Sequence, residues 1–447
     1  MSLRDQVQVQ LPGVLADLEE LVAIESGSAD SARTTEVERS AEYIVQLLVD
    51  LKCPHVSIIR AKDGAPAVIG RFPAPEGKPT VCLYAHHDVQ PEGDPVAWRT
   101  PPFVATELDG RLYGRGTSDD KGGFAVHLAA LRAFGGKPPV GVTVFVEGEE
   151  EIGSPTLVQL LEEHHGELAA DVFVIADSDN WAVGQPAFTT SLRGLAACTV
   201  EVRTLDHALH SGVYGGVAPD ALTTLCRLLA SLHDDQGNVA VSGLATAQAP
   251  ALVYPEERLR EESGILDGVD WIGSGSFVER MWSKPALSVI ALDATPVAKA
   301  SNTLIPAARA KISARLAPGD DAAKALANLI KHLEDHLPWG AQLTVSGAEI
   351  GEPSLINFTG PYAEAARHAF TQAWGVEPVF VGQGGTIPMA ADFGKAFPEA
   401  TILVTAVGDP DSRAHGSNES LHLGDFTAAC LAETLMLDAF AQLDLQG

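Results

Sequence analysis

Short apolar segments of strand length recur along the first part of the chain and alternate with segments of helical apolar period. The strand-like segments include residues 80–84, 142–146 and 171–176, and residues 124–134 and 157–168 carry the helical period. A continuous apolar run of this length is typical of a strand buried on both faces of a sheet. Because strands alternate with helices, the sequence predicts an α/β fold with a largely parallel sheet.

Histidine or carboxylate side chains follow each of these strand-like segments. The first is followed by His86 and Asp88, the second by the acidic run 147–151, and the third by Asp177 and Asp179. Sheets of this class place their sites at the carboxyl ends of the strands. Carboxylates packed together repel one another unless cations neutralise them. The pattern therefore predicts a metal site at this edge of the sheet.

Two more segments carry the same residue types, and each local pattern also has a simpler interpretation. Asp119 and Asp120 stand before a glycine-lined helix start, and His415 precedes the last helical segment. Paired acids at such a position also suit a helix N-terminus, and an acidic run is usually a solvated face. Chemistry alone leaves two registers open: which glutamate of the acidic run binds metal, and which aspartate after the third strand does.

The pattern of the chain changes after residue 193 and returns to the α/β type near residue 358. The intervening strands have no acidic side chains at their ends, which indicates a separate α+β layer. Its strands are expected at residues 195–202, 308–316 and 342–346, and its helices at residues 218–232 and 321–337. No structure is assigned to residues 244–288. We expect a catalytic domain interrupted by an inserted domain, with boundaries at 1–193, 194–352 and 353–447.

The composition indicates an acidic protein of the cytoplasm. The chain has 447 residues and a formal net charge of −29, which argues against nucleic acid or an anionic membrane as a partner. No apolar run has the length of a membrane span, and residues 1–5 lack the apolar core of a secretory signal. The cysteines form no CxxC pair, as in a reduced protein. They are Cys53, Cys82, Cys198, Cys226 and Cys430.

Taken together and in chain order, these motifs resemble those of the aminoacylase, carnosinase and glutamate carboxypeptidase family of dinuclear zinc peptidases. The similarity is greatest to the carnosinase-like dipeptidase branch, and it covers nearly the whole chain. It implies a zinc-exopeptidase-like catalytic domain with a mixed, largely parallel sheet flanked by helices. It also implies that the inserted α+β domain is a lid and dimerisation domain. The motifs that carry the resemblance are centred on His86, Asp119, Glu149–Glu151, Asp177–Asp179 and His415.

The resemblance implies a role for each residue of the predicted metal site. Asp119 bridges two metals, Asp88 supports the ligand His86, and Glu150 is the general base. A cis peptide is implied at Asp119-Asp120. The implied metal ligands are His86, Asp119, Glu151, Asp179 and His415.

The family pattern also selects between the registers that chemistry leaves open. Counted from Glu147, it places the base at Glu150 and the ligand at Glu151. The dipeptidase pattern matches Ser178-Asp179-Asn180-Trp181, so we expect Asp179 as the fourth ligand, with Asp177 as the alternative. Two divalent ions that share a carboxylate bridge suit imidazole and oxygen ligands. Zinc is expected, and manganese or cobalt could replace it.

Residues of the inserted domain are implied to contact the substrate. His210, in a His-Ser-Gly motif, would reach the site of a second subunit in a homodimer and stabilise the oxyanion. Without the family match, His210 would be interpreted as the cap of a glycine turn. Arg315 would bind the substrate carboxylate, for which a planar guanidinium is suited, although a surface arginine on a strand is the simpler interpretation. Further substrate contacts are expected from Asn302, Gly385 and Thr386.

The implied activity is metal-dependent hydrolysis of the peptide bond of dipeptides or short peptides. A water activated by two metals would attack, with a glutamate as general base. The alternative is an N-acyl amino-acid amidohydrolase with the same site. Aspartate rather than glutamate as the fourth ligand resembles the dipeptidase and aminopeptidase members of the family. A scaffold protein that had lost activity would lack a ligand or the base, and none is missing.

Overall fold

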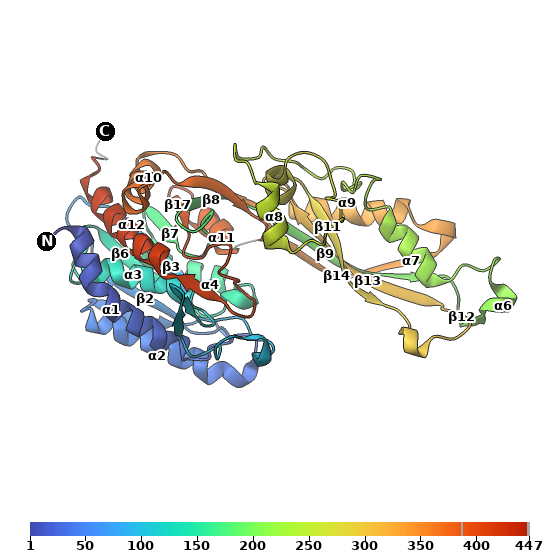
Figure 1. Cartoon of the computed structure of the whole chain (residues 1–447), viewed down its shortest axis with the longest axis horizontal. Helices are drawn as coiled ribbons and strands as arrows, with labels where there is room; N and C mark the ends of the chain where they lie inside the picture. The colour runs from blue at the N-terminus through green and yellow to red at the C-terminus, as the bar shows by residue number, and fades with distance from the viewer. Residues whose placement is uncertain (386–387, 445–447) are drawn as a thin grey trace. The chain divides into compact units, whose positions relative to one another are not determined.

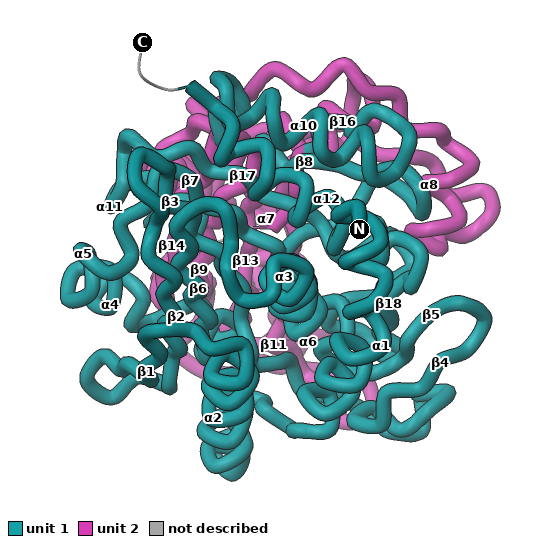
Figure 2. Tube along the Cα trace, turned by 90° about the vertical axis from the view of Figure 1, so that its left-hand side faces the viewer, with its two compact units in different colours: residues 1–190, 356–381, 388–447 teal, residues 191–355, 382–387 magenta. Residues whose placement is uncertain are grey.

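The computed structural model describes residues 1–385 and 388–444, which fold into two compact units (Figure 1). Unit 1 comprises residues 1–190, 356–381 and the described residues from 388 onward. Unit 2 comprises residues 191–355 and the described residues of 382–387 (Figure 2). Unit 2 is therefore inserted between two parts of unit 1 in the sequence. No helix in the described part of the chain is long and apolar enough to cross a membrane.

The central sheet of unit 1 has the strand order β1-β2-β6-β3-β7-β17-β8. The four strands β6, β3, β7 and β17 run parallel to one another, and β1, β2 and β8 pair antiparallel to their neighbours. The predicted mixed, largely parallel sheet is thus confirmed. The strands span His55–Ile59 (β1), Ala67–Phe72 (β2), Thr80–His86 (β3), Gly141–Glu147 (β6), Val172–Ile175 (β7), Ala187–Leu192 (β8) and Thr401–Thr405 (β17).

Helices cover this sheet and close its core. Helix α3 (Lys121–Ala133) packs between α1, α12 and β3, and every residue of α3 except Arg132 is buried. Helix α3 therefore has no polar face toward solvent, whereas helix α2 is amphipathic. The remaining helices of unit 1 span Leu3–Val22 (α1), Thr34–Asp50 (α2), Leu157–Glu163 (α4), His165–Leu168 (α5), Pro361–Trp374 (α10), Pro388–Ala396 (α11) and Leu423–Gln442 (α12).

Unit 2 is an antiparallel sheet of order β11-β13-β9-β14, with two helices that bury their apolar faces against it. This confirms the predicted inserted α+β fold. The strands span Gly194–Arg203 (β9), Ala286–Asp293 (β11), Ala307–Leu316 (β13) and Gln342–Gly351 (β14), and the helices span Ala221–Ala230 (α7) and Ala322–Asp335 (α9). The unassigned segment 244–288 contains helix α8 (Glu256–Ser263), a π-helical turn (Glu279–Ser283) and the start of β11.

Short elements complete the description. A three-stranded sheet joins β4 (Thr106–Leu108), β5 (Arg111–Tyr113) and β18 (Ser420–His422). Strands β10 (Leu209–His210) and β12 (Thr303–Leu304) pair with each other, and helix α6 (Ser211–Tyr214) follows β10. The remaining strands are β15 (Ser354–Leu355) and β16 (Val379–Gln383), and the 3-10 turns are Ser31–Arg33, Pro95–Ala97, Glu150–Ile152, Val297–Lys299 and Pro338–Gly340.

Candidate metal centre

His86, the last residue of β3, is completely buried. Its Nδ1 lies 3.0 Å from the carbonyl oxygen of Asp88, so Nδ1 carries the proton and donates to that oxygen. In its neutral form this tautomer has the lone pair of Nε2 available to bind a metal. Burial alone would lower the pKa of His86, but the carboxylates of Asp119 and Asp88 outweigh burial and raise it well above its usual value.

Asp119 lies between two histidines. Its Oδ1 is 3.0 Å from His86 Nε2, and its Oδ2 is 2.9 Å from His415 Nε2. Burial would raise the pKa of Asp119, but the two imidazoles hold it well below its usual range. A carboxylate with one oxygen toward each histidine has the arrangement of a ligand that bridges two cations. The expected cis peptide at Asp119-Asp120 is present.

Two clusters of possible ligands meet at this carboxylate. In each cluster, the candidate ligand atoms all lie within 4.8 Å of one another. In the second cluster, His415 Nε2 also lies 3.2 Å from Glu151 Oε2, and these contacts raise the pKa of His415 to about 10. The clusters are His86, Asp120 and Asp177, and Asp119, Glu151 and His415.

The structure places Asp177, and not Asp179, beside His86. Asp177 Oδ2 lies 4.0 Å from His86 Nε2. Asp179 instead pairs with Gly408 in an isolated β-bridge, and a Cβ at residue 408 would lie 2.1 Å from Asp179 Oδ1. Burial raises the pKa of both aspartates to about 7, so protonation does not distinguish them. The geometry therefore favours the alternative that the sequence left open, because the chain leaves the strand after Ile175 and the two-residue alternation ends there.

Asp120 is a cluster member to which the sequence assigned no role. Its Oδ2 accepts a hydrogen bond from the backbone of His86 at 3.2 Å, and its buried Oδ1 has no partner among the described residues. A Cβ on Gly123 would lie 2.1 Å from this Oδ1, so glycine is needed for the carboxyl group to fit. The glycine pair at the helix start was the signal that could have identified it.

Asp88 contacts both His86 and the acidic run. Its Oδ1 lies 3.5 Å from His86 Nδ1 and accepts from the backbone of Glu150 at 3.2 Å. Its Oδ2 accepts from the backbone of Glu151 at 3.0 Å and from the hydroxyl of Ser28 at 2.6 Å. Asp88 therefore holds the turn that presents both glutamates to the cluster, and Ser28 supports it from a loop that the sequence did not single out.

The three glutamates of the acidic run have different surroundings. Glu149 is structural, since its carboxylate accepts from the backbones of Thr156 at 2.8 Å and Ala65 at 3.0 Å. Glu151 faces His415, as described above. Glu150 Oε2 lies 3.9 Å from His86 Nε2, and no described N–H or O–H group donates to its carboxylate. Burial, together with nearby carboxylates, raises the pKa of Glu150 well above its usual value. A carboxylate with raised proton affinity and a free oxygen suits proton transfer.

The residues present fit two divalent cations. Imidazole nitrogens and carboxylate oxygens are the donor set of zinc, manganese and cobalt sites. One carboxylate faces both histidines, and an unpaired buried oxygen remains on Asp120. Burial, with a further contribution from neighbouring carboxylates, raises the pKa of Asp177 to about 7. Cations would relieve the repulsion between these carboxylates.

His210 and Asn302 lie side by side in unit 2. His210 is exposed at the end of β10, and its Nδ1 accepts from the backbone of Gly212 at 3.0 Å. The simpler interpretation of this histidine, as the cap of a glycine turn, is therefore consistent with its contacts. Because Nδ1 is the acceptor, Nε2 carries the proton and can donate to a ligand. The backbone oxygen of Asn302 accepts from Ser211, the residue that follows His210, at 2.9 Å.

Arg315, on β13, has no carboxylate partner among the described residues. It lies close enough to Arg193 that burial and the Arg315 charge together lower the pKa of Arg193 to about 10. Arg193 is buried, donates to the backbone oxygen of Arg280 at 3.1 Å and has an unpaired Nε. Two cations without a counter-ion suit an anionic ligand. Sequence reasoning missed Arg193, because the strand that precedes it, β8, lacks a continuous apolar pattern.

The last two predicted substrate contacts, Gly385 and Thr386, are adjacent in the sequence. Gly385 is described, and Thr386 lies outside the described residues.

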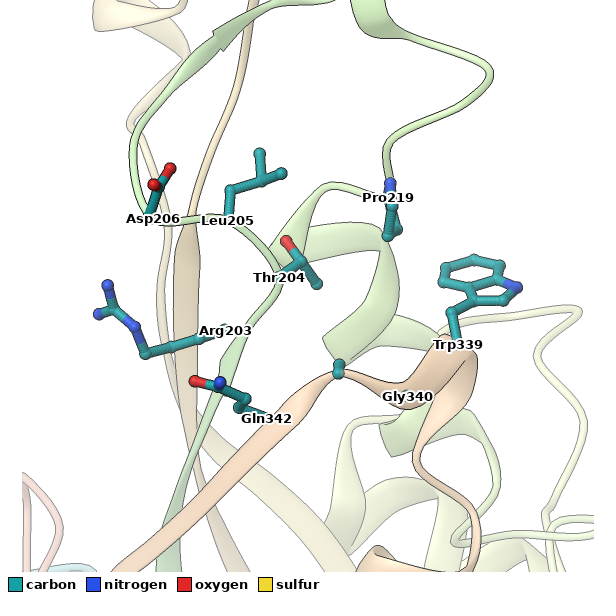
Figure 3. Close-up of a pocket in the computed structure, with 9 residues that line it drawn as sticks. Arg203, Thr204, Leu205, Asp206, Pro219, Trp339, Gly340 and Gln342 are labelled. Carbon is teal, nitrogen blue, oxygen red and sulfur yellow. The ribbon is translucent and has the colours of Figure 1, made fainter.

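Unit 2 also contains a pocket of about 410 Å³, shown in Figure 3. Its walls include Arg203, Thr204 and Trp339, but none of the predicted substrate residues.

Comparisons with known proteins show similarity to peptidases over most of the chain. The model of peptidase family M20/M25/M40 matches residues 82–438. The chain is 33% identical over 431 residues to the cysteinylglycine-S-conjugate dipeptidase of Corynebacterium striatum, which covers 95% of this chain and 94% of that protein. It is 30% identical over 378 residues to the beta-Ala-His dipeptidase of Homo sapiens, across 80% of this chain and 74% of that protein. The crystal structure of human carnosine dipeptidase 1 matches with a TM-score of 0.81 at 26% identity, covering 99% of this chain and 98% of that one.

Proposed function

The chain belongs to peptidase family M20/M25/M40 and is a hydrolase, and from this premise we propose that it is a metal-dependent dipeptidase. The observation that carries the proposal is the carboxylate of Asp119, whose two oxygens lie 3.0 Å and 2.9 Å from the imidazoles of His86 and His415. The substrate class rests on the two relatives named above, both of which are dipeptidases.

Two divalent ions, with zinc preferred and manganese or cobalt as substitutes, are the proposed cofactors. The proposed ligands differ from those expected from the sequence at one position, where Asp177 replaces Asp179 because it lies beside His86. When bound, such ions polarise the scissile carbonyl and make a water molecule acidic. The ligands would be His86 and Asp177 for one ion, Glu151 and His415 for the other, and Asp119 for both.

Glu150 is the proposed general base. Its carboxylate takes the proton of the attacking water and passes it to the amine that leaves when the peptide C–N bond breaks. The absence of any described donor to this carboxylate supports the role, because both oxygens remain free for a proton. Asp88 supports the same step by fixing the backbone of Glu150 at 3.2 Å.

Arg315 is the proposed partner of the substrate carboxylate, and Arg193 adds positive charge beside it. The unneutralised guanidinium pair supports this assignment. Asn302 and the loop of Gly385 and Thr386 are proposed as further contacts. An anion-binding pair suits a free dipeptide better than an internal peptide segment, because only the former carries its terminal carboxylate next to the scissile bond.

Residues 194–352 are proposed to form a lid and dimerisation domain that carries His210 to the site of a second subunit. Strand β11 supports a homodimer, because it is an edge strand with solvent-exposed apolar side chains. Val289, Ile290 and Leu292 are 43%, 57% and 47% exposed. An open apolar edge is a template for pairing with another chain. The Nε2–H of His210 is the proposed donor to the developing oxyanion.

A cytoplasmic location without nucleic-acid or membrane partners is also proposed. The five cysteines are free, as in proteins of reducing compartments. The formal charge of −29 disfavours binding to polyanions.

A substrate panel tests the proposed function. Protein reconstituted with zinc or manganese is incubated with a dipeptide library and with N-acyl amino acids, and released amino acids are quantified. We expect the highest kcat/KM among dipeptides, with Glu150→Gln as the inactive control. A preference for N-acyl amino acids would replace the dipeptidase by the amidohydrolase alternative, and no hydrolysis of either class would contradict both.

A further inference from the structure

Gln90 donates a hydrogen bond to each carboxylate oxygen of Glu151. The backbone N–H of Gln90 donates to Glu151 Oε1 at 3.0 Å, and the side-chain amide donates to Glu151 Oε2 at 2.7 Å. The same amide also donates to the backbone oxygen of Glu151 at 3.2 Å. Each oxygen of this carboxylate therefore receives a hydrogen bond from a single residue, in the loop that follows β3.

These bonds leave Glu151 little freedom. The side chain of Glu151 is only 3% exposed, so water cannot replace the contacts to Gln90 without a change in packing. The Oε2 that accepts from the amide also lies 3.2 Å from His415 Nε2. The amide thus fixes the rotation of the carboxylate while a lone pair remains directed toward the cluster of Asp119 and His415.

In the other cluster, the carboxylate of Asp177 has no comparable hydrogen-bond donor among the described residues. No described N–H or O–H group donates to it, and its Oδ2 lies 4.0 Å from His86 Nε2. The two carboxylates at the ends of the centre are therefore prepared differently. Glu151 is held in one orientation before a cation binds. The side chain of Asp177 instead loses conformational entropy when a cation binds.

We propose that Gln90 is a positioning residue that presets Glu151 and so sets the cation affinity of the Asp119, Glu151 and His415 cluster alone. This inference rests on the two-metal function proposed above. Partners that orient metal ligands typically contribute about 10- to 100-fold in metal affinity. Gln90 contacts the ligand and not the reacting atoms, so its removal should weaken one of two metal sites and leave the chemistry intact once both are filled.

The test compares Gln90→Met with a matched control. Methionine keeps the backbone donor and the approximate length of the side chain but removes the amide. Gln159→Met is the control, because Gln159 donates to Glu163 at 2.7 Å in an equivalent amide–carboxylate contact on the exposed face of α4. Apo forms of each protein are titrated with Zn²⁺ against a competing chelator and with Co²⁺ by visible absorption. If Gln90→Met does not fold, Gln90→Leu takes its place.

For Gln90→Met we expect one equivalent to bind as in the wild type and the other about 10- to 100-fold more weakly. At saturating metal, kcat and KM should return to wild-type values, and Gln159→Met should change neither affinity. Glu151→Gln should weaken the same equivalent, and combining it with Gln90→Met should add nothing, since both act through one carboxylate. Unchanged affinities, or equal weakening of both equivalents, would overturn the proposal.

The failure of this proposal can be separated from failure of the proposed function. A wild-type protein that binds two metals but hydrolyses no dipeptide contradicts the function and leaves the role of Gln90 standing on the titration. A wild-type protein that binds fewer than two metals contradicts the two-metal function and overturns the positioning role with it.

Discussion

Glu150 and Glu151 are adjacent, yet their surroundings suit them to different tasks. Glu151 accepts hydrogen bonds at both carboxylate oxygens and lies beside His415. Glu150 accepts none from the described residues and is 15% exposed. A fully held carboxylate makes a good ligand, and a free one with raised proton affinity makes a good base. The proposed division of roles therefore rests on the contacts of the two side chains rather than on their position in the run.

Glu150→Gln should bind both metals and lose about 10²- to 10⁴-fold in turnover, because the amide matches the carboxylate in shape but cannot accept a proton. Metal content by elemental analysis and kcat on the preferred dipeptide check this. If Glu150→Gln emptied a metal site and Glu151→Gln did not, the assignment of base and ligand would be off by one residue.

Asp177→Asn should remove one of two bound metals, whereas Asp179→Asn should leave both in place. The reason is the 4.0 Å approach of Asp177 to His86, while Asp179 lies against Gly408. Metal-to-protein ratios after dialysis against a weak chelator distinguish the two variants. The reverse result would restore Asp179 as the fourth ligand.

At the scale of elements, the centre forms because parallel strands end at one edge of a sheet. Strands β3, β6 and β7 are adjacent, with His86 paired to Glu147 at their ends. Helix α3 then starts beside that edge, and its glycines admit the carboxyl group of Asp120. The order of strands is what brings residues distant in sequence into one cluster.

Much of this could be predicted from the sequence, because apolar strands and the polar residues after them leave a local pattern. The choice between Asp177 and Asp179 could not, since alternation applies only within a strand and β7 ends at Ile175. The contact of Gln90 with Glu151 is tertiary and has no local signature. Strand β8 was also missed, because its residues Thr189, Thr190 and Ser191 weaken the apolar pattern that marks buried strands.

A buried pair joins two helices of unit 1. His127 Nδ1, on α3, lies 2.9 Å from both carboxylate oxygens of Glu433 on α12, and Nε2 lies 2.9 Å from the carbonyl oxygen of Tyr84. Burial alone would lower the pKa of His127, but the charge of Glu433 and these hydrogen bonds outweigh it and raise the pKa above 6.5. The protonated imidazole thus links α3, α12 and β3.

This pair predicts a pH-dependent stability. A raised folded-state pKa stabilises the protein fully below the unfolded-state value near 6.5, and the effect is lost as pH rises through the folded-state pKa. The free energy of unfolding of apo wild type should therefore exceed that of Glu433→Gln most at about pH 6, and the difference should shrink at higher pH. Urea titrations of both proteins in excess chelator measure it. A difference that stays constant from about pH 6 to 9 would contradict this account.

At the scale of the whole molecule, the proposed dimer makes each active site depend on two chains. The exposed edge of β11 offers a pairing surface, and His210 stands exposed in the same unit. A residue supplied by the partner can be tested without an interface structure. Two inactive variants, each changed at a different residue, can be combined in one oligomer.

Mixing His210→Ala with Glu150→Gln should restore activity if His210 acts in the partner's site. A mixed dimer then has one site with both defects and one site with none, so up to about half of wild-type activity per heterodimer is expected for independent sites. Steady-state rates before and after subunit exchange give the result. No recovery, with exchange demonstrated by mass spectrometry, would place His210 in its own chain or in a structural role.

One titration shows whether dipeptide hydrolysis depends on two divalent ions in the strand-end clusters. Chelator-treated protein is supplied with increasing Zn²⁺ or Mn²⁺, and dipeptide hydrolysis and bound metal are measured in the same samples. A two-metal mechanism predicts no activity without metal, a plateau at two bound ions per chain, and two bound ions without turnover in Glu150→Gln. Activity that survives complete removal of metal, or that saturates with one ion per chain, would contradict it.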